Sequence, residues 1–256
     1  MTWQPPSEEW TLPTRHVGQR VLVYDRLEST NDLAAALAGQ PAHAGWAVLA
    51  REQTAGRGQH GRRWLCGPGM GVLLSVLLFP PPPLRRPAIL TAWAAVAVCR
   101  TVHHLIRQPA RIKWPNDVVV GGRKVCGILI EQRLGTVVGI GLNVNQSADD
   151  FAQAGLPLAA SLATLTGQAR DCDQVARLLL GRLDAAYGRL LEGDLSTLEA
   201  AWRRRLGLRG RRVVVETGEG TQLCRLREIS WQGLELESAG RRYRLPPEAV
   251  RHIWPE

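Results

Sequence analysis

The chain has 256 residues, of which 45% are hydrophobic and 21% charged, and a formal net charge of +9. These are the proportions of an ordinary soluble globular protein, long enough for one large domain or for one domain with an appendage. The longest apolar run that we identify, residues 71–79, is too short for a membrane span, and the N-terminus lacks a secretory signal pattern. We therefore predict no association with a membrane.

Cysteine usage indicates a reducing compartment. The five cysteines are scattered and odd in number, which favours free thiols in the cytoplasm over a disulfide framework. They are Cys66, Cys99, Cys126, Cys172 and Cys224. Neither a CxxC pair nor an HxxxH spacing indicates a metal cage, so we assign no metal ligands from the sequence.

The positive charge is concentrated towards the C-terminus. Residues 203–256 hold twelve arginines and seven glutamates, which leaves a surplus of +5 in that segment. Because the arginines are interleaved with glutamates and form no recognition-helix pattern, we predict a solvated or partner-facing surface and no DNA binding.

The N-terminal elements begin after a loose lead-in, residues 1–14, which is rich in Pro, Trp and polar residues. We predict a strand over residues 21–24, then a capped helix that begins at Ser29-Thr30-Asn31-Asp32 and stops at Gly39. Capping alone would explain the polar residues at the helix start. Exposed N–H groups and hydroxyls there can also bind anions and carbonyls, so both interpretations stand.

Residues 54–64 form a loop rich in glycine and arginine after a strand predicted over residues 46–53. Glycine lets the backbone approach a ligand closely, and Arg57 and Arg62 can neutralise a phosphate or a carboxylate. The loop lacks the GK[ST] of a Walker A motif and is not followed by the helix of a dinucleotide fingerprint. Taken alone, it fits a mobile surface turn equally well.

The middle of the chain contains both of its lysines, Lys113 and Lys124, among 32 basic residues. An ammonium is a compact point charge, so arginine cannot replace it freely where a cation must reach between two anions. The pair Asn116-Asp117 is either a turn or a polar pair aimed into a site. Lys124 opens the second strand of a predicted hairpin, which has strands over residues 118–120 and 124–131 and a Gly-Gly turn.

The predicted elements together indicate an α+β fold. A buried strand over residues 71–79 is followed by an apolar helix from Pro87 to Ile106, and a strand over residues 136–144 is interrupted by Gly139 and Gly141. Further helices are predicted over residues 158–166, 173–191 and 195–206. Short strand-like runs after residue 209 indicate a small β-barrel of about 45 residues. We expect a mixed sheet covered by helices over residues 1–207 and a C-terminal barrel over residues 208–256.

Several motifs occur in one consistent order along the chain. They are Ser29-Thr30-Asn31, Glu52-Gln53-Thr54-Ala55-Gly56-Arg57-Gly58 with Gly61-Arg62, Lys113-Trp114-Pro115-Asn116-Asp117, Arg123-Lys124 with Gly127, and Gly139-x-Gly141-x-Asn143. In this order they closely resemble the bacterial biotin protein ligases, from about residue 20 to the C-terminal end. The lysine-containing run and the Gly/Arg loop carry the resemblance. It implies a catalytic domain of the biotin/lipoate ligase type and an SH3-like C-terminal barrel.

The resemblance also implies roles for individual residues. Those that would bind biotin are Ser29, Thr30, Asn31, Gln53, Gly56, Arg57, Gly58, Gln59, Lys124, Gly127, Leu129, Gly139 and Gly141. Those on the ATP side are Arg62, Trp64, Lys113, Asn116, Asp117 and Asn143. Lys124 would lie between the biotin carboxylate and the α-phosphate of ATP, and the implied catalytic set is Lys124, Arg57 and Asp117.

The implied reaction uses ATP, Mg²⁺ and biotin in two steps. Biotin is activated as biotinyl-5′-AMP, and a lysine on a biotin carboxyl carrier domain, of acetyl-CoA carboxylase or a related enzyme, then takes the acyl group. Two anions must meet in the first step, so positive charge is needed on both. The sequence does not identify the general base of the transfer step, because Asp117 fits that role and a structural turn equally. It also leaves open whether the protein is a monomer or a homodimer.

Two features qualify the resemblance. The family loop often carries arginine where this chain has Gln59, which predicts faster release of the biotinyl-adenylate. Ser29 begins the first motif, which leaves no room for the N-terminal DNA-binding domain of some members, so we expect no repressor role.

Two other functions are weighed against this one. A lipoate or octanoate ligase is similar in fold and chemistry, and Cys126 beside Lys124 would then suggest a thioester mechanism. A small buried residue in a strand explains Cys126 better. A non-catalytic basic protein that binds nucleic acid through its arginine-rich tail would leave both lysines unexplained.

Overall fold

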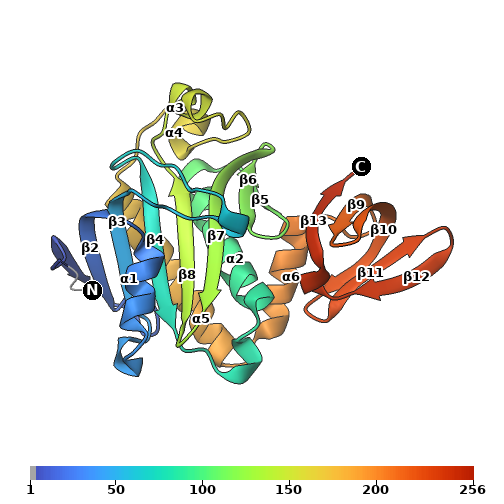
Figure 1. Ribbon diagram of the computed structural model, residues 1–256, viewed down its shortest axis with the longest axis horizontal. Helices are drawn as coiled ribbons and strands as arrows, with labels where there is room; N and C mark the ends of the chain where they lie inside the picture. Colours follow the sequence, from blue (N-terminus) through green and yellow to red (C-terminus); the bar gives the residue numbers. More distant parts are fainter. Residues whose placement is uncertain (1–3) are drawn as a thin grey trace.

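The computed structural model describes residues 4–256 and is organised around an eight-stranded mixed sheet (Figure 1). The strand order is β1-β2-β3-β4-β8-β7-β6-β5. The strands are β1 (Glu8–Thr11), β2 (Arg20–Leu27), β3 (Ala47–Gln53), β4 (Gly71–Leu78), β5 (Ala110–Lys113), β6 (Asp117–Val120), β7 (Arg123–Gln132) and β8 (Thr136–Asn143). Among these eight strands only β2 and β3 pair in parallel, which requires the crossover helix α1 (Thr30–Leu37) between them.

Helices cover the two faces of this sheet unequally (Figure 1). On one face α1 packs against β3, β4 and β8, and the rest of that face carries the cavity described below. The other face is covered by α2 (Pro87–Ile106) and α5 (Cys172–Leu191), with α6 (Leu195–Leu206) beside them. Two short helices, α3 (Ala148–Gln153) and α4 (Leu162–Thr166), follow β8. Short 3₁₀ turns occur at Pro41–His43, Gln59–Gly61, Pro82–Leu84 and Pro247–Ala249.

Alternate residues of β7 and β8 face the core on one side of the sheet and the cavity on the other. Successive side chains of a strand point to opposite faces, so Ile128, Ile140 and Leu142 lie in the main core with α2. Their neighbours Gly127 and Gly141 face the cavity. The core-facing and the cavity-facing positions of β7 and β8 are therefore interleaved in the sequence.

Helix α2 corrects our expectation that residues 71–79 are the longest apolar run. It is long and apolar enough to cross a membrane by length and composition, but most of it is buried inside the protein. Trp93 near its start is fully buried, and its Nε1 donates to the Leu183 carbonyl of α5 at 3.1 Å. We interpret α2 as the central core helix.

A second, five-stranded antiparallel sheet follows α6 and has the order β12-β11-β10-β9-β13. Its strands are β9 (Arg212–Thr217), β10 (Gly220–Ser230), β11 (Gly233–Ser238), β12 (Arg241–Leu245) and β13 (Val250–Pro255). Trp231 stacks on Trp202 of α6 with ring centroids 4.7 Å apart. The Trp114 indole donates to the Val250 carbonyl at 2.9 Å, so β13 is joined to the loop before β6.

Several predicted elements are confirmed and others are corrected. The α+β class is confirmed, as are the bounds of α2 and α6 and the Gly-Gly turn, where Gly121 and Gly122 have φ of 56° and 79°. The lead-in is wrong for residues 8–11, because β1 pairs with β2 and buries Trp10; residues 1–3 lie outside the described part of the chain.

The remaining corrections concern short segments whose partners are distant in sequence. The helix predicted over residues 158–166 begins only at Leu162, because the preceding residues run beside Lys124. The prediction also missed β5, β13 and α3. At α1, Ser29 occupies the N-cap position without a side-chain cap bond, and the Gln53 side chain accepts from the Thr30 N–H instead.

Candidate active site

A cavity of about 420 Å³ opens on the α1 face of the large sheet. It brings together every predicted site residue except Gly56. These residues come from the start of α1, β3, the 56–64 loop, strands β5 and β6 with the loop between them, and strands β7 and β8. Gly56 is buried just outside, where its carbonyl accepts from the Trp64 N–H at 2.9 Å and a Cβ would collide with the Trp64 carbonyl.

The floor of the cavity consists of two rows of residues across β4, β8 and β7. One row is Ser75, Gly139 and Leu129, and the next is Leu73, Gly141 and Gly127. All of these line the cavity except Ser75, which is fully buried beneath it. The rows are two residues apart along each strand, which corresponds to about 7 Å. Because neither glycine of β8 has a side chain, the Asn31 amide at Gly139 and the Trp64 indole at Gly141 lie close to the bare backbone of the strand.

The first row leads to a group of polar residues that we call the polar end, made of Ser29, Thr30, Asn31, Gln53 and Ser75, of which the last four are joined by hydrogen bonds. The Thr30 N–H and hydroxyl both donate to Gln53 Oε1, at 2.8 and 3.0 Å. The Ser75 hydroxyl lies 2.7 Å from Thr30 Oγ1 and 2.5 Å from Asn31 Oδ1. A Cβ on Gly139 would collide with the Asn31 amide, so glycine is required beside this group.

The second row leads to what we call the lysine end, made of Lys124 and Asp117. Lys124 Nζ lies 2.7 Å from Asp117 Oδ1, and its side chain is 38% exposed, so the ammonium can still reach a ligand. The backbone of Lys124 is paired on the open side of β7: its N–H donates to the Leu158 carbonyl at 2.7 Å, and its carbonyl accepts from Ala160 at 2.8 Å. These contacts fix the backbone position from which the Lys124 side chain extends.

The Lys113–Asp117 run links the lysine end to the rest of the protein. The Trp114–Pro115 peptide bond is cis, and Asn116 Nδ2 donates to the Ile128 carbonyl at 2.7 Å. Lys113 lines the cavity and is exposed. The run thus places a second cation, Lys113, and the carboxylate of Asp117 at the same end of the cavity.

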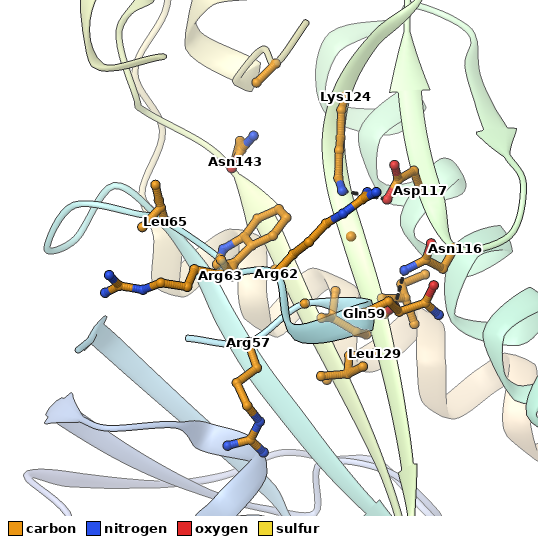
Figure 2. Close-up of a pocket in the computed structure, with 18 of the residues that line it drawn as sticks. Arg57, Gln59, Arg62, Arg63, Leu65, Asn116, Asp117, Lys124, Leu129 and Asn143 are labelled. Atoms are coloured by element: carbon orange, nitrogen blue, oxygen red, sulfur yellow. Dashed lines mark hydrogen bonds and ion pairs between the residues drawn. The ribbon is translucent and has the colours of Figure 1, made fainter. Parts of the chain in front are cut away.

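The 56–64 loop is a small hairpin over the cavity. Gly58 N–H donates to the Arg62 carbonyl at 2.7 Å, and the turn contains His60 and Gly61, both with positive φ. Figure 2 shows Arg62 reaching towards Asp117 and Lys124. The Trp64 indole lies against Gly127 and Gly141, and its Nε1 is buried without a partner among the described residues.

Arg57 lies elsewhere. Figure 2 shows its side chain pointing away from Lys124 and Asp117. Its guanidinium lies 2.6 Å from Asp32 and 3.0 Å from Glu131. The hydrogen bond to Asp32 and then the contacts with Glu131 raise the pKa of Arg57 above its ordinary value. The structure therefore brings Lys124 and Asp117 together, and separates Arg57 from them.

The side chain of Asn143 forms hydrogen bonds within the protein. Its side chain is buried, donates to the Ala160 carbonyl at 3.1 Å, and accepts from Gln146 Nε2 at 3.0 Å. It lines the cavity while supporting the 156–160 segment beside Lys124.

The cysteines do not contribute to the cavity chemistry. The five cysteines are free thiols, and burial raises the pKa of Cys126 well above its ordinary value. Cys126 lies on the core face of β7, so the thioester interpretation has no support. Within residues 4–256 no three His, Cys, Asp or Glu side chains gather as a metal site.

The sequence did not single out several residues of the site. Ser75 had a signal, because it is the polar residue inside the otherwise aliphatic run Gly71–Leu78. No sequence pattern identified Glu131 or His252. Glu131 is connected to the site through its contacts with Arg57 and Asn31, and His252 comes from β13 in the second sheet.

Comparisons with known proteins agree with this geometry. A family model described as the biotin/lipoate A/B protein ligase family matches residues 23–146. The biotin–[acetyl-CoA-carboxylase] ligase of Mycobacterium tuberculosis is 34% identical over 263 residues, covering 98% of this chain and 97% of that protein. The chain is a member of the biotin protein ligase family. The resemblance seen in the sequence motifs is confirmed.

Other members of the biotin protein ligase family are similar over different shares of their length. The bifunctional ligase/repressor BirA of Bacillus subtilis is 34% identical over 197 residues, which are 75% of this chain and 61% of BirA. This chain thus spans less than two thirds of that relative. The biotin protein ligase of Aquifex aeolicus, solved with biotin and ATP, has the same fold, with a TM-score of 0.79, 24% identity, and coverage of 92% and 99%.

Proposed function

We propose that this member of the biotin protein ligase family activates biotin with ATP and transfers it to a lysine of a biotin carboxyl carrier domain. One observation carries the proposal: the polar end and the lysine end lie on one glycine-lined floor, in a single cavity. The polar end offers neutral donors and acceptors suited to an uncharged head group. The lysine end offers cations where a carboxylate and a phosphate would meet.

The first step forms a bond from a biotin carboxylate oxygen to the α-phosphorus of ATP, and pyrophosphate leaves. Lys124 touches both anions through its ammonium donors, and Asp117 holds that ammonium in place. Arg62, Trp64, Lys113, Asn116 and Asn143 line the nucleotide side. In the second step the carrier lysine nitrogen bonds to the acyl carbon, loses a proton, and AMP leaves.

Mg²⁺ fits this site as an ion that arrives with the nucleotide. Mg²⁺ is usually bound by one or two carboxylates together with substrate phosphates, and Asp117 is the carboxylate at the lysine end. When bound, it neutralises charge on the phosphates. Asp117 would then orient Lys124 and face the ion.

We also propose a two-domain architecture and a cellular location for this protein. The C-terminal sheet forms an SH3-like barrel over residues 208–256, following a catalytic domain over residues 1–207, and it lies beside the nucleotide side of the cavity through Trp114 and Val250. The protein acts in the cytoplasm, in keeping with its free cysteines.

The test measures AMP release and the transfer of labelled biotin to a carrier domain, with biotin or lipoate as the acid. We expect AMP and transfer with biotin, and neither with lipoate; the opposite preference would refute the proposal. Lys124→Arg should reduce biotin transfer by about 10²–10³-fold, because the planar guanidinium of arginine cannot replace the compact ammonium of lysine between two anions. Lys113→Arg is the matched control, for which we expect a higher KM for ATP and an almost unchanged kcat.

A further inference from the structure

We infer that Asp32 and Glu131 are positioning residues that hold Arg57, and with it the 56–64 loop, at the polar end of the cavity. The inference rests on the proposed function only for the identity of the ligand. It assigns Arg57 to loop anchoring, in place of the catalytic role that the sequence resemblance implies.

The contacts of Arg57 support this assignment. Its Nη1 donates to Asp32 Oδ2 at 2.6 Å, and its Nη2 donates to both carboxylate oxygens of Glu131, at 3.2 and 3.0 Å. Two carboxylates thus surround one guanidinium, which leaves it little net charge with which to attract a third anion. Asp32 comes from the first turn of α1 and Glu131 from β7, so Arg57 bridges two separate elements.

The position of Glu131 along β7 places Arg57 far from the lysine end. Gly127 lies beside Lys124, and Glu131 is four residues further along the same strand and faces the same side of the sheet. At the usual rise of a strand this separation is about 13 Å. A guanidinium held at Glu131 therefore cannot also touch a carboxylate that is bound at Lys124.

Glu131 also connects the anchor to the polar end. Asn31 Nδ2 donates to Glu131 Oε2 at 2.6 Å, and Asn31 Oδ1 is bonded to the Ser75 hydroxyl. From there the contacts continue through Thr30 to Gln53. A ligand head group bound among these residues would share partners with the group that holds Arg57.

The loop behaves as one unit because of its internal bonds. The pairs Gly58–Arg62 and Gly56–Trp64 close the hairpin, so it is attached to the protein through side chains on both of its strands. Trp64 attaches one side by lying against the glycine floor, and Arg57 attaches the other. Loss of the carboxylates should therefore release the Arg57 side and leave the Trp64 side in place.

Trypsin cleavage after Arg57, on the side of the loop that the two carboxylates hold, mapped by mass spectrometry, tests the anchor in the full chain without any ligand. Asp32→Asn and Glu131→Gln should each increase cleavage within the loop by about two- to five-fold, as expected for partly exposed ion pairs, and the double variant should increase it further. Glu9→Gln is the matched control, since it removes the exposed Arg20–Glu9 pair between β1 and β2. Cleavage in the variants equal to that in the control would overturn the inference.

Steady-state kinetics supply the second measurement. Arg57→Gln should raise the KM for biotin several-fold and leave kcat within about two-fold of the wild type, because only ground-state positioning is lost. If kcat instead falls by about 100-fold or more, Arg57 acts at the reacting atoms and the inference is overturned. If biotin is not a substrate at all, the proposed function fails, while the cleavage experiment still decides the anchor.

Discussion

The two faces of β8 differ sharply in what they contribute. Ile140 and Leu142 are 2% and 1% exposed in the core against α2, whereas Gly139 and Gly141, on the opposite face, line the cavity. One face stabilises the fold through the side-chain volume it buries, and the other lets Asn31 and Trp64 of the cavity wall lie close to the backbone because it has no side chains. Substitutions at neighbouring positions should therefore have separable effects on stability and on binding.

Leu142→Ala should show the largest effect, and it should be an effect on stability. Removing a fully buried leucine side chain typically lowers the free energy of unfolding by about 2–5 kcal/mol. Urea denaturation measures this loss, with activity assayed well below the new midpoint. A variant with native stability and impaired ligation would contradict the division between the two faces.

Gly141→Ala should act on the site. A Cβ there collides with the Trp64 indole, so the 56–64 loop must shift while the core face of β8 is unchanged. We expect kcat/KM to fall by about 10–100-fold, since misplacement of the order of 1 Å costs that much, and the free energy of unfolding to change by less than about 1 kcal/mol. Kinetics and denaturation on the same preparation check both halves, and a stability loss equal to that of Leu142→Ala would count against the prediction.

Gln59→Arg should have the smallest effect, and in the opposite direction. Gln59 lies in the loop and lines the cavity, and an arginine there would add a cation for the acyl-adenylate. We expect the variant to release biotinyl-adenylate several-fold more slowly than the wild type in a single-turnover assay. Equal release rates from the two proteins would remove any role for this position in retention.

Local sequence features were enough for a large part of the fold. The apolar period of α2 and the Gly-Gly turn between β6 and β7 matched the structure because each depends on residues close together in the chain. Strand β1 and the late start of α4 were not predicted, since β1 is ordered by pairing with β2 and the residues before α4 run beside Lys124. Short segments of this kind take their structure from partners that are distant in sequence.

For the site, the sequence by itself determined which residue types are available. The two lysines, the glycines of β8 and most of the Gly/Arg loop line one cavity, as the family resemblance implied. Only the tertiary structure decided which carboxylate each of these cations pairs with. Lys124 pairs with Asp117, whereas Arg57, which looked equivalent as a cation, is held between Asp32 and Glu131 at the other end. A guanidinium is placed by the carboxylates nearest to it in space, and α1 and β7 meet only when the sheet is assembled.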